Sequence, residues 1–282
     1  MKRVFAIIFS ALLPIAAIAQ GRVYESSDSI RIEHILHCVG DNKSNNTGEL
    51  IITIADKLIG EKYVAGTLER GIEEPLFISC TKLDCTTFVE LVLAIAMTTN
   101  ERSTSFNDVC RNLERIRYRN GKNNGYTSRL HYISWWITEN TKKGIVEDVT
   151  SHISCDKQQL NLYFMSTHPN SYPILADNPH LIKEIERMES PYRDKEVCYI
   201  PKENIGTTGD EKIKNGDIIA ITTSIQGLDV THIGFAYYNE GTLCLYHASS
   251  GKEKVTKETE PFRDYIIRNK RHTGIRVFRA VF

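Results

Sequence analysis

Apolar positions in the first two thirds of the chain recur with the spacing of one helix face. Residues three and four positions apart lie on the same side of a helix, so this spacing predicts amphipathic helices. Asp84 can cap one of them, with Phe88 and Val92 on its apolar face. The predicted helices lie at residues 30–39, 49–58 (begun by Thr47 or Gly48), 84–96, 106–116, 127–143 and 178–188, and residues 167–173 predict a loop.

The pattern changes in the C-terminal third of the chain. Short runs rich in β-branched and apolar residues predict strands there. Two of these runs flank the turn sequence Asn239-Glu240-Gly241, and Pro261 can begin a short helix before the last strand. The predicted strands lie at residues 218–222, 230–238, 242–248 and 274–281. This order predicts a single α+β domain over residues 20–282, with a helical insertion around residues 100–200.

The first residues have the composition of a secretory signal. Lys2 and Arg3 precede an apolar run at residues 4–13, and residues 14–19 end in small side chains typical of a cleavage site. This pattern predicts a leader at residues 1–19 and a secreted, periplasmic mature protein; an uncleaved membrane anchor is the alternative. Because no second long apolar run follows, we expect no stable membrane insertion after cleavage.

The charge balance argues against a nucleic-acid-binding protein. The chain has 35 Lys and Arg residues against 35 Asp and Glu, whereas nucleic-acid proteins usually carry a basic excess. Its seven cysteines include no Cys-x-x-Cys pair, which argues against a zinc ribbon. An odd number leaves at least one free thiol or an intermolecular bond, and the spacing does not show which others pair. Cys110 and Cys244 fall on apolar faces and are expected in the core.

Cys85 is the strongest candidate for a catalytic residue. It follows Asp84 in the first turn of a predicted helix, where unpaired backbone N–H groups favour a thiolate. His232 and His247 lie far downstream on predicted strands. A nucleophile followed by a base and an orienting polar group is the order expected of a papain-like thiol hydrolase. The alternative is a core cysteine with two structural histidines, because cysteine is often buried.

Strand pairing predicts that the two histidines share one face of a hairpin. If Asn239 pairs with Thr242 across a two-residue turn, His247 lies opposite Gly234, which leaves room for another group. His232 is then the diagonal neighbour of His247, at roughly 7–8 Å between backbones. An odd-length turn or a bulge would put the two rings on opposite faces.

These residues predict covalent catalysis without a metal ion or an organic cofactor. Cys85 would attack a carbonyl carbon and pass its proton to His232, which His247 would orient. The backbone N–H of Cys85 and the phenol of Tyr63 could bind the oxyanion, although Tyr63 taken alone fits a packing residue. The charge of Asp84 opposes a thiolate, so the protonated form of His232 would have to outweigh it.

Aromatic and arginine side chains gather between residues 118 and 136. Consecutive residues of a helix point about 100° apart, so one of Trp135 and Trp136 is expected to line a groove. Aromatic rings stack on sugars and arginines bind carboxylates, but core packing with a polar surface explains the pattern equally well. The cluster consists of Tyr118, Arg119, Tyr126, Arg129, His131, Tyr132, Trp135 and Trp136.

Several short motifs together resemble the NlpC-type papain-like cell-wall hydrolases. The motifs are Gly60-x-x-Tyr63-x-x-Gly66, Asp84-Cys85-x-Thr87-Phe88-Val89, Gly216-Asp217, His232-Ile233-Gly234 and His247-Ala248-Ser249. Two longer stretches, at residues 63–69 and 118–132, are similar to the branch called N-acetylmuramoyl-L-alanine amidase-like, formerly a domain of unknown function. The resemblance extends from about Leu50 to the end of the chain, with a departure at residues 79–82.

The resemblance implies a circularly permuted relative of papain, in which a helix carrying Cys85 packs on an antiparallel sheet carrying both histidines. It also implies hydrolysis of the amide bond between N-acetylmuramic acid and L-alanine in small muropeptides, with Tyr63 in the oxyanion site. The substrate-binding candidates are Glu90, Arg119, Tyr126, Arg129, Tyr132 and Trp136.

Three other functions compete with this interpretation. An endopeptidase would cut between D-glutamate and a diamino acid, which is the commoner activity of the wider superfamily. A catalytically inactive wall-binding module would bind peptidoglycan fragments without turnover. A lipid acyltransferase is the least favoured, because no amphipathic membrane helix accompanies the site.

Overall fold

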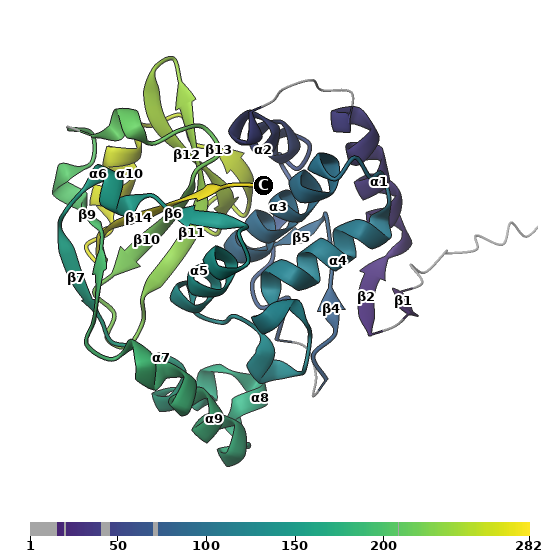
Figure 1. Ribbon diagram of the computed structural model, residues 1–282, viewed down its shortest axis with the longest axis horizontal. Helices are drawn as coiled ribbons and strands as arrows, with labels where there is room; N and C mark the ends of the chain where they lie inside the picture. Colours follow the sequence, from purple (N-terminus) through teal and green to yellow (C-terminus); the bar gives the residue numbers. More distant parts are fainter. Residues whose placement is uncertain (1–15, 20, 41–45, 70–72, 208) are drawn as a thin grey trace, which may run out of the picture.

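A layer of helices packs against a curled sheet, and a smaller group of helices extends from one edge of the molecule (Figure 1). The computed structural model describes residues 16–19, 21–40, 46–69, 73–207 and 209–282. The protein is therefore an α+β protein, as the change from helical to strand periodicity predicts.

The helical layer contains the helices of the first half of the chain, two of which begin away from their predicted starts. They are α1 (Ser26–Gly40), α2 (Thr47–Asp56), α3 (Cys85–Asn100), α4 (Phe106–Arg117) and α5 (Ile133–Lys142). α1 begins before residue 30 and includes Asp28, whose Oδ1 accepts from the backbone N–H of Cys80 at 2.7 Å. α5 begins at Ile133, after the predicted start at residue 127. In its first turn, the N–H of Ser134 donates to the buried Asp229 at 2.6 Å.

α3 lies at the centre of the molecule. All of its side chains at residues 87–98 are buried, so its sequence is apolar on nearly every face. The ring of Phe88 packs against those of Phe235 and Tyr246, with centroids 5.7 and 5.8 Å away. These partners lie on the neighbouring strands β11 (Val230–Asn239) and β12 (Thr242–Ser249), so α3 docks directly on the middle of the sheet.

Over the described residues, the main sheet has nine strands, in the order β5-β3-β13-β12-β11-β10-β14-β6, with β9 beside β14. The other strands are β3 (Lys62–Tyr63), β5 (Lys82–Leu83), β6 (Val146–Asp148), β9 (Ile200–Pro201), β10 (Ile218–Thr223), β13 (Lys254–Lys257) and β14 (His272–Ala280). The four predicted strands are confirmed as β10, β11, β12 and β14. α10 (Phe262–Arg268) follows Pro261 as predicted, and Phe262 and Ile266 join a second apolar core.

The hairpin of β11 and β12 has the predicted register. Asn239 pairs with Thr242, and Phe235 pairs with Tyr246. Glu240 and Gly241 form the turn with φ angles of 49° and 82°, the left-handed conformation that two-residue hairpin turns favour.

Residues 157–198 form an excursion with its own short sheet. β7 (Lys157–Leu160) pairs with β8 (Lys195–Cys198), and α7 (Phe164–Thr167), α8 (Pro173–Ala176) and α9 (Pro179–Glu189) lie between them. α9 confirms the helix predicted at residues 178–188, with Asn178 as its cap. The segment at residues 167–173, predicted as a loop, includes a short 3-10 turn, Pro169–Ser171. Another short helix, α6 (Thr150–Ile153), precedes the excursion.

A small sheet flanks the helical layer at its N-terminal side. β1 (Ala16–Ala19) pairs with β2 (Arg22–Glu25), which also pairs with β4 (Leu76–Phe77). The leader predicted at residues 1–19 lies mostly outside the described residues, so it stays a prediction. Among the described residues, no helix is both long enough and apolar enough to cross a membrane.

The docking of α3 gives a stability prediction. Phe88 is fully buried, so we expect Phe88→Ala to lower the free energy of unfolding by about 3–5 kcal/mol, because it leaves a cavity against the sheet. Ile59→Ala, at a position that is 53 % exposed, should change it by less than about 0.5 kcal/mol. Chemical denaturation measures both variants, and a similar small effect for the two would contradict this packing.

Candidate active site

Cys85 is the first residue of α3, because Asp84 caps the helix as predicted. The N–H of Thr87 donates to Asp84 Oδ1 at 2.8 Å, and the N–H of Asp84 donates to Thr87 Oγ1 at 2.8 Å. This capping box fixes the first turn of the helix and therefore the position of the cysteine. Cys85 is partly exposed, whereas the helix beyond it is buried.

The thiol of Cys85 lies against the strand that carries the predicted base. A backbone hydrogen bond joins it to Ile233, which directly follows His232 on β11. Tyr63 on β3 lies close to the same helix tip. Burial, followed by the charges of Cys85 and Asp84, raises the pKa of Tyr63 to about 12. The fold thus brings together three parts of the chain that are distant in sequence.

The two histidines share one face of the hairpin, as the register predicts. His232 Nε2 lies 2.5 Å from His247 Nδ1, and the two rings are nearly perpendicular, at 89°. Gly234 permits this arrangement, because a Cβ there would lie 2.9 Å from Cβ of His247. His247 is fully buried and His232 is partly exposed, so His232 is the ring nearer to solvent.

Two residues that the sequence analysis missed extend this polar chain. His247 Nε2 lies 3.0 Å from Glu258 Oε1, and Lys252 Nζ lies 2.5 Å from Glu258 Oε2. On the same side, the ring of Tyr265 in α10 packs edge-on against His247, with centroids 5.4 Å apart. Glu258 lies in the charged segment 252–260, which has the pattern of a solvated surface, so its burial has no signal in the sequence.

Burial and the charge of Asp84 oppose the thiolate that was expected at the helix tip. Burial and then the charge of Asp84 raise the pKa of Cys85 to about 11, against smaller opposing effects of hydrogen bonds from Ile233 and Thr86. Burial, and after it His247, lowers the pKa of His232 to about 3. Both shifts favour a neutral thiol beside a neutral imidazole, opposite in direction to the protonated His232 expected to outweigh Asp84.

A cavity of about 180 Å³ opens beside the helix tip. Asp84 and Thr86, on either side of Cys85 in the chain, line it together with Arg129. The excursion at residues 157–198 contributes Met165 and Tyr172 to its wall. A ligand in this cavity would therefore contact the excursion while it lies next to the cysteine.

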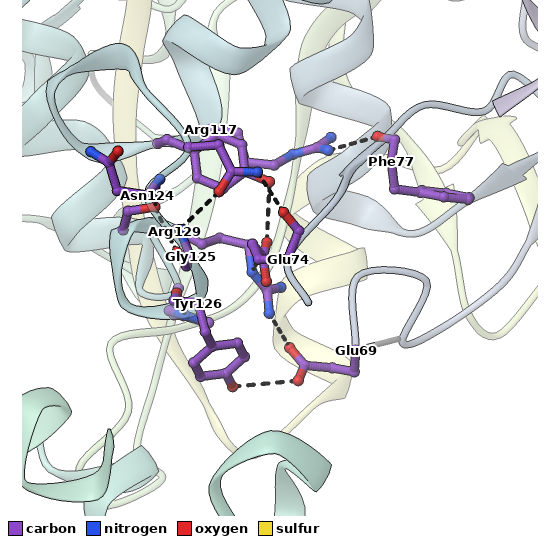
Figure 2. Close-up of polar contacts among 12 residues, drawn as sticks. Glu69, Glu74, Phe77, Arg117, Asn124, Gly125, Tyr126 and Arg129 are labelled. Carbon is purple, nitrogen blue, oxygen red and sulfur yellow. Dashed lines mark hydrogen bonds and ion pairs between the residues drawn. The ribbon is translucent and has the colours of Figure 1, made fainter. Parts of the chain in front are cut away.

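Ion pairs hold the polar wall of the cavity in place (Figure 2). Arg129 Nη2 lies 2.5 Å from Glu69 Oε1, and Arg129 Nε lies 3.0 Å from Glu74 Oε1. The phenol of Tyr126 also donates to Glu69, at 3.3 Å. Arg129 is thereby paired with two carboxylates that precede β4 in the chain, and Tyr126 supports one of them.

The six predicted substrate-binding residues divide into two groups. Glu90, Arg129 and Tyr132 line the cavity. Arg119, Tyr126 and Trp136 lie outside its lining; the guanidinium of Arg119 lies over the ring of Trp135 at 5.6 Å.

Two of the cavity residues have polar side chains that are bonded within the protein. Glu90 is buried and forms an ion pair with Arg117 at 2.7 Å. The phenol of Tyr132 donates to Glu189 at 2.7 Å. These residues therefore form a rigid wall, and a ligand would meet them as oriented groups.

The prediction that one of the two tryptophans lines a groove is wrong. Trp135 is 1 % exposed and Trp136 is 2 % exposed. Trp136 donates from Nε1 to Glu90 at 3.2 Å, and Trp135 packs against the ring of Tyr132, with centroids 4.9 Å apart. The two rings project from different faces of α5, and other parts of the protein cover both faces, so both rings are buried.

The remaining cysteines and histidines do not form a second centre among the described residues. Cys110 and Cys244 are buried as predicted, and all seven cysteines are free. Within the described part of the chain, His, Cys, Asp and Glu side chains form no group of three or more that could hold a metal ion. At residues 79–82, where the sequence departs from the family pattern, Cys80 is buried and bonded to Asp28.

Comparison with known families identifies the chain. The family model described as N-acetylmuramoyl-L-alanine amidase-like (AmiA-like) matches residues 53–275, which is most of the sequence. The chain belongs to this amidase-like family. No curated protein matches it.

Solved structures similar to this amidase-like protein have its fold over nearly their whole length. An N-acetylmuramoyl-L-alanine amidase from Bacteroides uniformis is 42 % identical, with a TM-score of 0.80 over 84 % of this chain and 99 % of its own. A putative xylanase from Bacteroides fragilis is 46 % identical, with a TM-score of 0.76 over 80 % and 98 %. A Legionella pneumophila protein, 22 % identical with a TM-score of 0.69 over 90 % and 94 %, shares the fold.

The electrostatic role of Asp84 can be tested with an isosteric change. Asp84→Asn keeps an N-cap acceptor but removes the charge next to the thiol, so the pKa of Cys85 should fall and its alkylation should accelerate at a given pH. Mass spectrometry of the Cys85 peptide after iodoacetamide treatment across a pH series measures the shift. Asp108→Asn in the first turn of α4 is the matched control. A profile that stays in place or moves to higher pH in Asp84→Asn would contradict this assignment.

Proposed function

We propose that this amidase-like protein is a secreted cysteine amidase that hydrolyses the bond between N-acetylmuramic acid and L-alanine in muropeptides. The observation that carries the proposal is the thiol of Cys85, held at a helix tip against the strand of His232 and its partner His247. Membership of the amidase-like family and similarity to the Bacteroides uniformis amidase support the same reaction. The leader predicted at residues 1–19 would deliver the enzyme to the periplasm, where peptidoglycan lies.

The chemistry begins with a neutral pair. As the sulfur of Cys85 attacks the lactyl carbonyl carbon, its proton passes to the ring nitrogen of His232 that does not face His247. His232 then returns this proton to the amide nitrogen of L-alanine, and the peptide leaves with a free amino group. Water, deprotonated by His232, hydrolyses the thioester and frees the muramic acid carboxylate. Because His232 is neutral at rest, it has a lone pair that can take the proton as the bond to sulfur forms.

The negative oxygen of each tetrahedral intermediate needs donors that are already in place. The backbone N–H of Cys85 is one donor, because it lies in the first turn of α3 and has no partner within the helix. The phenol of Tyr63 is the second. Its raised pKa keeps the phenol protonated, so it remains a donor at every pH at which the enzyme would work.

The topology supports a circularly permuted papain-like architecture, which belongs to the same proposal. The nucleophile comes first, on a helix, and the base and its orienting residue follow on two antiparallel strands under that helix. The cavity beside the nucleophile, with Glu90, Arg129 and Tyr132 in its lining, is the proposed substrate site. Three other residues are proposed to act at the margin of this site. Arg119 is partly exposed there, Tyr126 bonds to Glu69, and Trp136 bonds to Glu90.

The central test is the product of a defined muropeptide. Wild type should release the free sugar and an intact stem peptide, and Cys85→Ala should slow this by at least about 10³-fold, because loss of a nucleophile removes the covalent route. Liquid chromatography with mass spectrometry measures both products, and Cys38→Ala, at an exposed cysteine, is the control. A shortened stem peptide would indicate an endopeptidase. Binding without turnover would indicate a wall-binding module, and cleavage by Cys85→Ala would eliminate the covalent mechanism.

The oxyanion role of Tyr63 predicts a selective kinetic effect. Tyr63→Phe removes only the hydroxyl, so kcat should fall by about 10²–10³-fold while KM changes little. Steady-state kinetics on the same muropeptide separates the two constants. Tyr24→Phe, at a tyrosine that packs against Phe106 in the N-terminal sheet, should retain wild-type kcat. An effect confined to KM would assign Tyr63 to substrate binding.

A further inference from the structure

A line of four hydrogen-bonded side chains runs from the proposed active site through the interior to the surface. His232 bonds to His247, His247 bonds to Glu258, and Glu258 bonds to Lys252. His247 is fully buried and Glu258 is 3 % exposed, whereas Lys252 reaches the surface from the connection between β12 and β13. The last family motif ends at Ser249, so Glu258 and Lys252 have no assigned part in the reaction.

The chemistry of a carboxylate fixes the direction of every hydrogen bond in this line. An ionised carboxylate only accepts, so Nε2 of His247 must carry a proton and donate it to Glu258. A neutral His247 then has a bare Nδ1, which can only accept, and the partner Nε2 of His232 must therefore be the donor. His232 is left with its proton on Nε2 and a lone pair on Nδ1, which is the form that a general base requires.

Glu258 stays ionised because two donors hold it. Burial raises the pKa of this carboxyl, but the hydrogen bonds from Lys252 and His247 outweigh burial and leave it below its ordinary value. Lys252 also limits the effect of Glu258 on the imidazoles. Its positive charge lowers the pKa of His247, in the same direction as burial. Burial and then His247 lower the pKa of His232, so both rings stay neutral near pH 7.

We propose that Glu258 and Lys252 form a positioning pair that sets the tautomers of His247 and His232 and so leaves the basic nitrogen free for Cys85. This inference deepens the proposed amidase reaction and rests on it. Neither residue touches the reacting atoms in this scheme: Glu258 acts through His247, and Lys252 acts through Glu258.

Several other ionisable groups lie near these two rings and could also titrate within the pH range of the experiments. Tyr265 packs on His247, and His272 on β14 contributes to the electrostatics of His232. The ionisable groups around the four hydrogen-bonded side chains are Asp84 and Cys85 at the N-terminus of α3, Tyr63 on β3, Tyr237 on β11, Tyr265 and Arg268 on α10, Glu260 before α10, and His272 on β14. Since all of them remain in Glu258→Gln and in Lys252→Met, a change in profile reports the substituted residue.

Glu258→Gln tests the direction of the hydrogen bonds at almost constant shape. The amide can donate to Nε2 of His247, which would move the proton of His247 to Nδ1 and that of His232 to the nitrogen facing the thiol. We expect kcat on the muropeptide to fall by about 10²-fold or more, since the general base is lost, while KM changes less than about twofold. Glu260→Gln, two residues away and paired with Arg268, is the matched control.

Nitrogen-15 NMR of the histidine rings reads the tautomers directly and needs no substrate. In wild type and Glu260→Gln, both His232 and His247 should carry their proton on Nε2, and in Glu258→Gln both should carry it on Nδ1. Wild-type tautomers in Glu258→Gln, with or without loss of activity, would overturn the inference and leave Glu258 a structural role. Should wild type fail to cleave muropeptides while its tautomers are as expected, the proposed reaction fails and the positioning pair stands.

Lys252→Met provides a second test at an exposed position, and circular dichroism confirms that the variant is folded. Removal of the positive charge should raise the pKa of His247, so this ring becomes protonated at higher pH and the acidic limb of kcat/KM moves to higher pH. Lys254→Met, at an exposed lysine on β13, should move the limb less. Equal limbs in Lys252→Met and wild type, or equal shifts in the two lysine variants, would overturn the part assigned to Lys252.

Discussion

The packing of α3 against β11 and β12 stabilises the core and also positions the side chain of Cys85. Phe88 lies three residues after Cys85, so the two side chains project from the same side of the helix. The contact of Phe88 with Phe235 and Tyr246 sets how the helix meets the sheet, and the thiol then reaches the backbone of Ile233. A purely apolar interaction therefore fixes the position of a reactive group, and every polar contact of the site is built on that placement.

The features that follow from local pattern could be predicted from the sequence. The strands β10, β11, β12 and β14, the cap at Asp84 and the register of the hairpin depend on neighbouring residues, and the sequence contains those neighbours. The shared face of His232 and His247 follows from that register alone. Strands of two or three residues, such as β3 and β5, are too short for any period to show.

The features that depend on distant residues could not be predicted in this way. Glu258 is buried because the fold places it under His247, although its charged neighbours in sequence suggest a surface. Trp135 and Trp136 are both buried because different elements cover the two faces of α5. The thiol of Cys85 has a raised pKa because burial and Asp84 act more strongly than the helix terminus, and sequence alone does not give the relative sizes of these effects. In each case the feature depends on which distant residues the fold brings into contact, and the local sequence does not contain that information.

The excursion at residues 157–198 has a consequence for how such a protein can diversify. Its two strands bond to each other in a sheet of their own, so the ladder beneath the two histidines does not depend on it. The same excursion nevertheless supplies Met165 and Tyr172 to the cavity beside the nucleophile. Changes in its length or sequence can therefore alter ligand specificity while the catalytic residues and the main sheet stay the same. Related proteins could differ in this segment and still share one reaction.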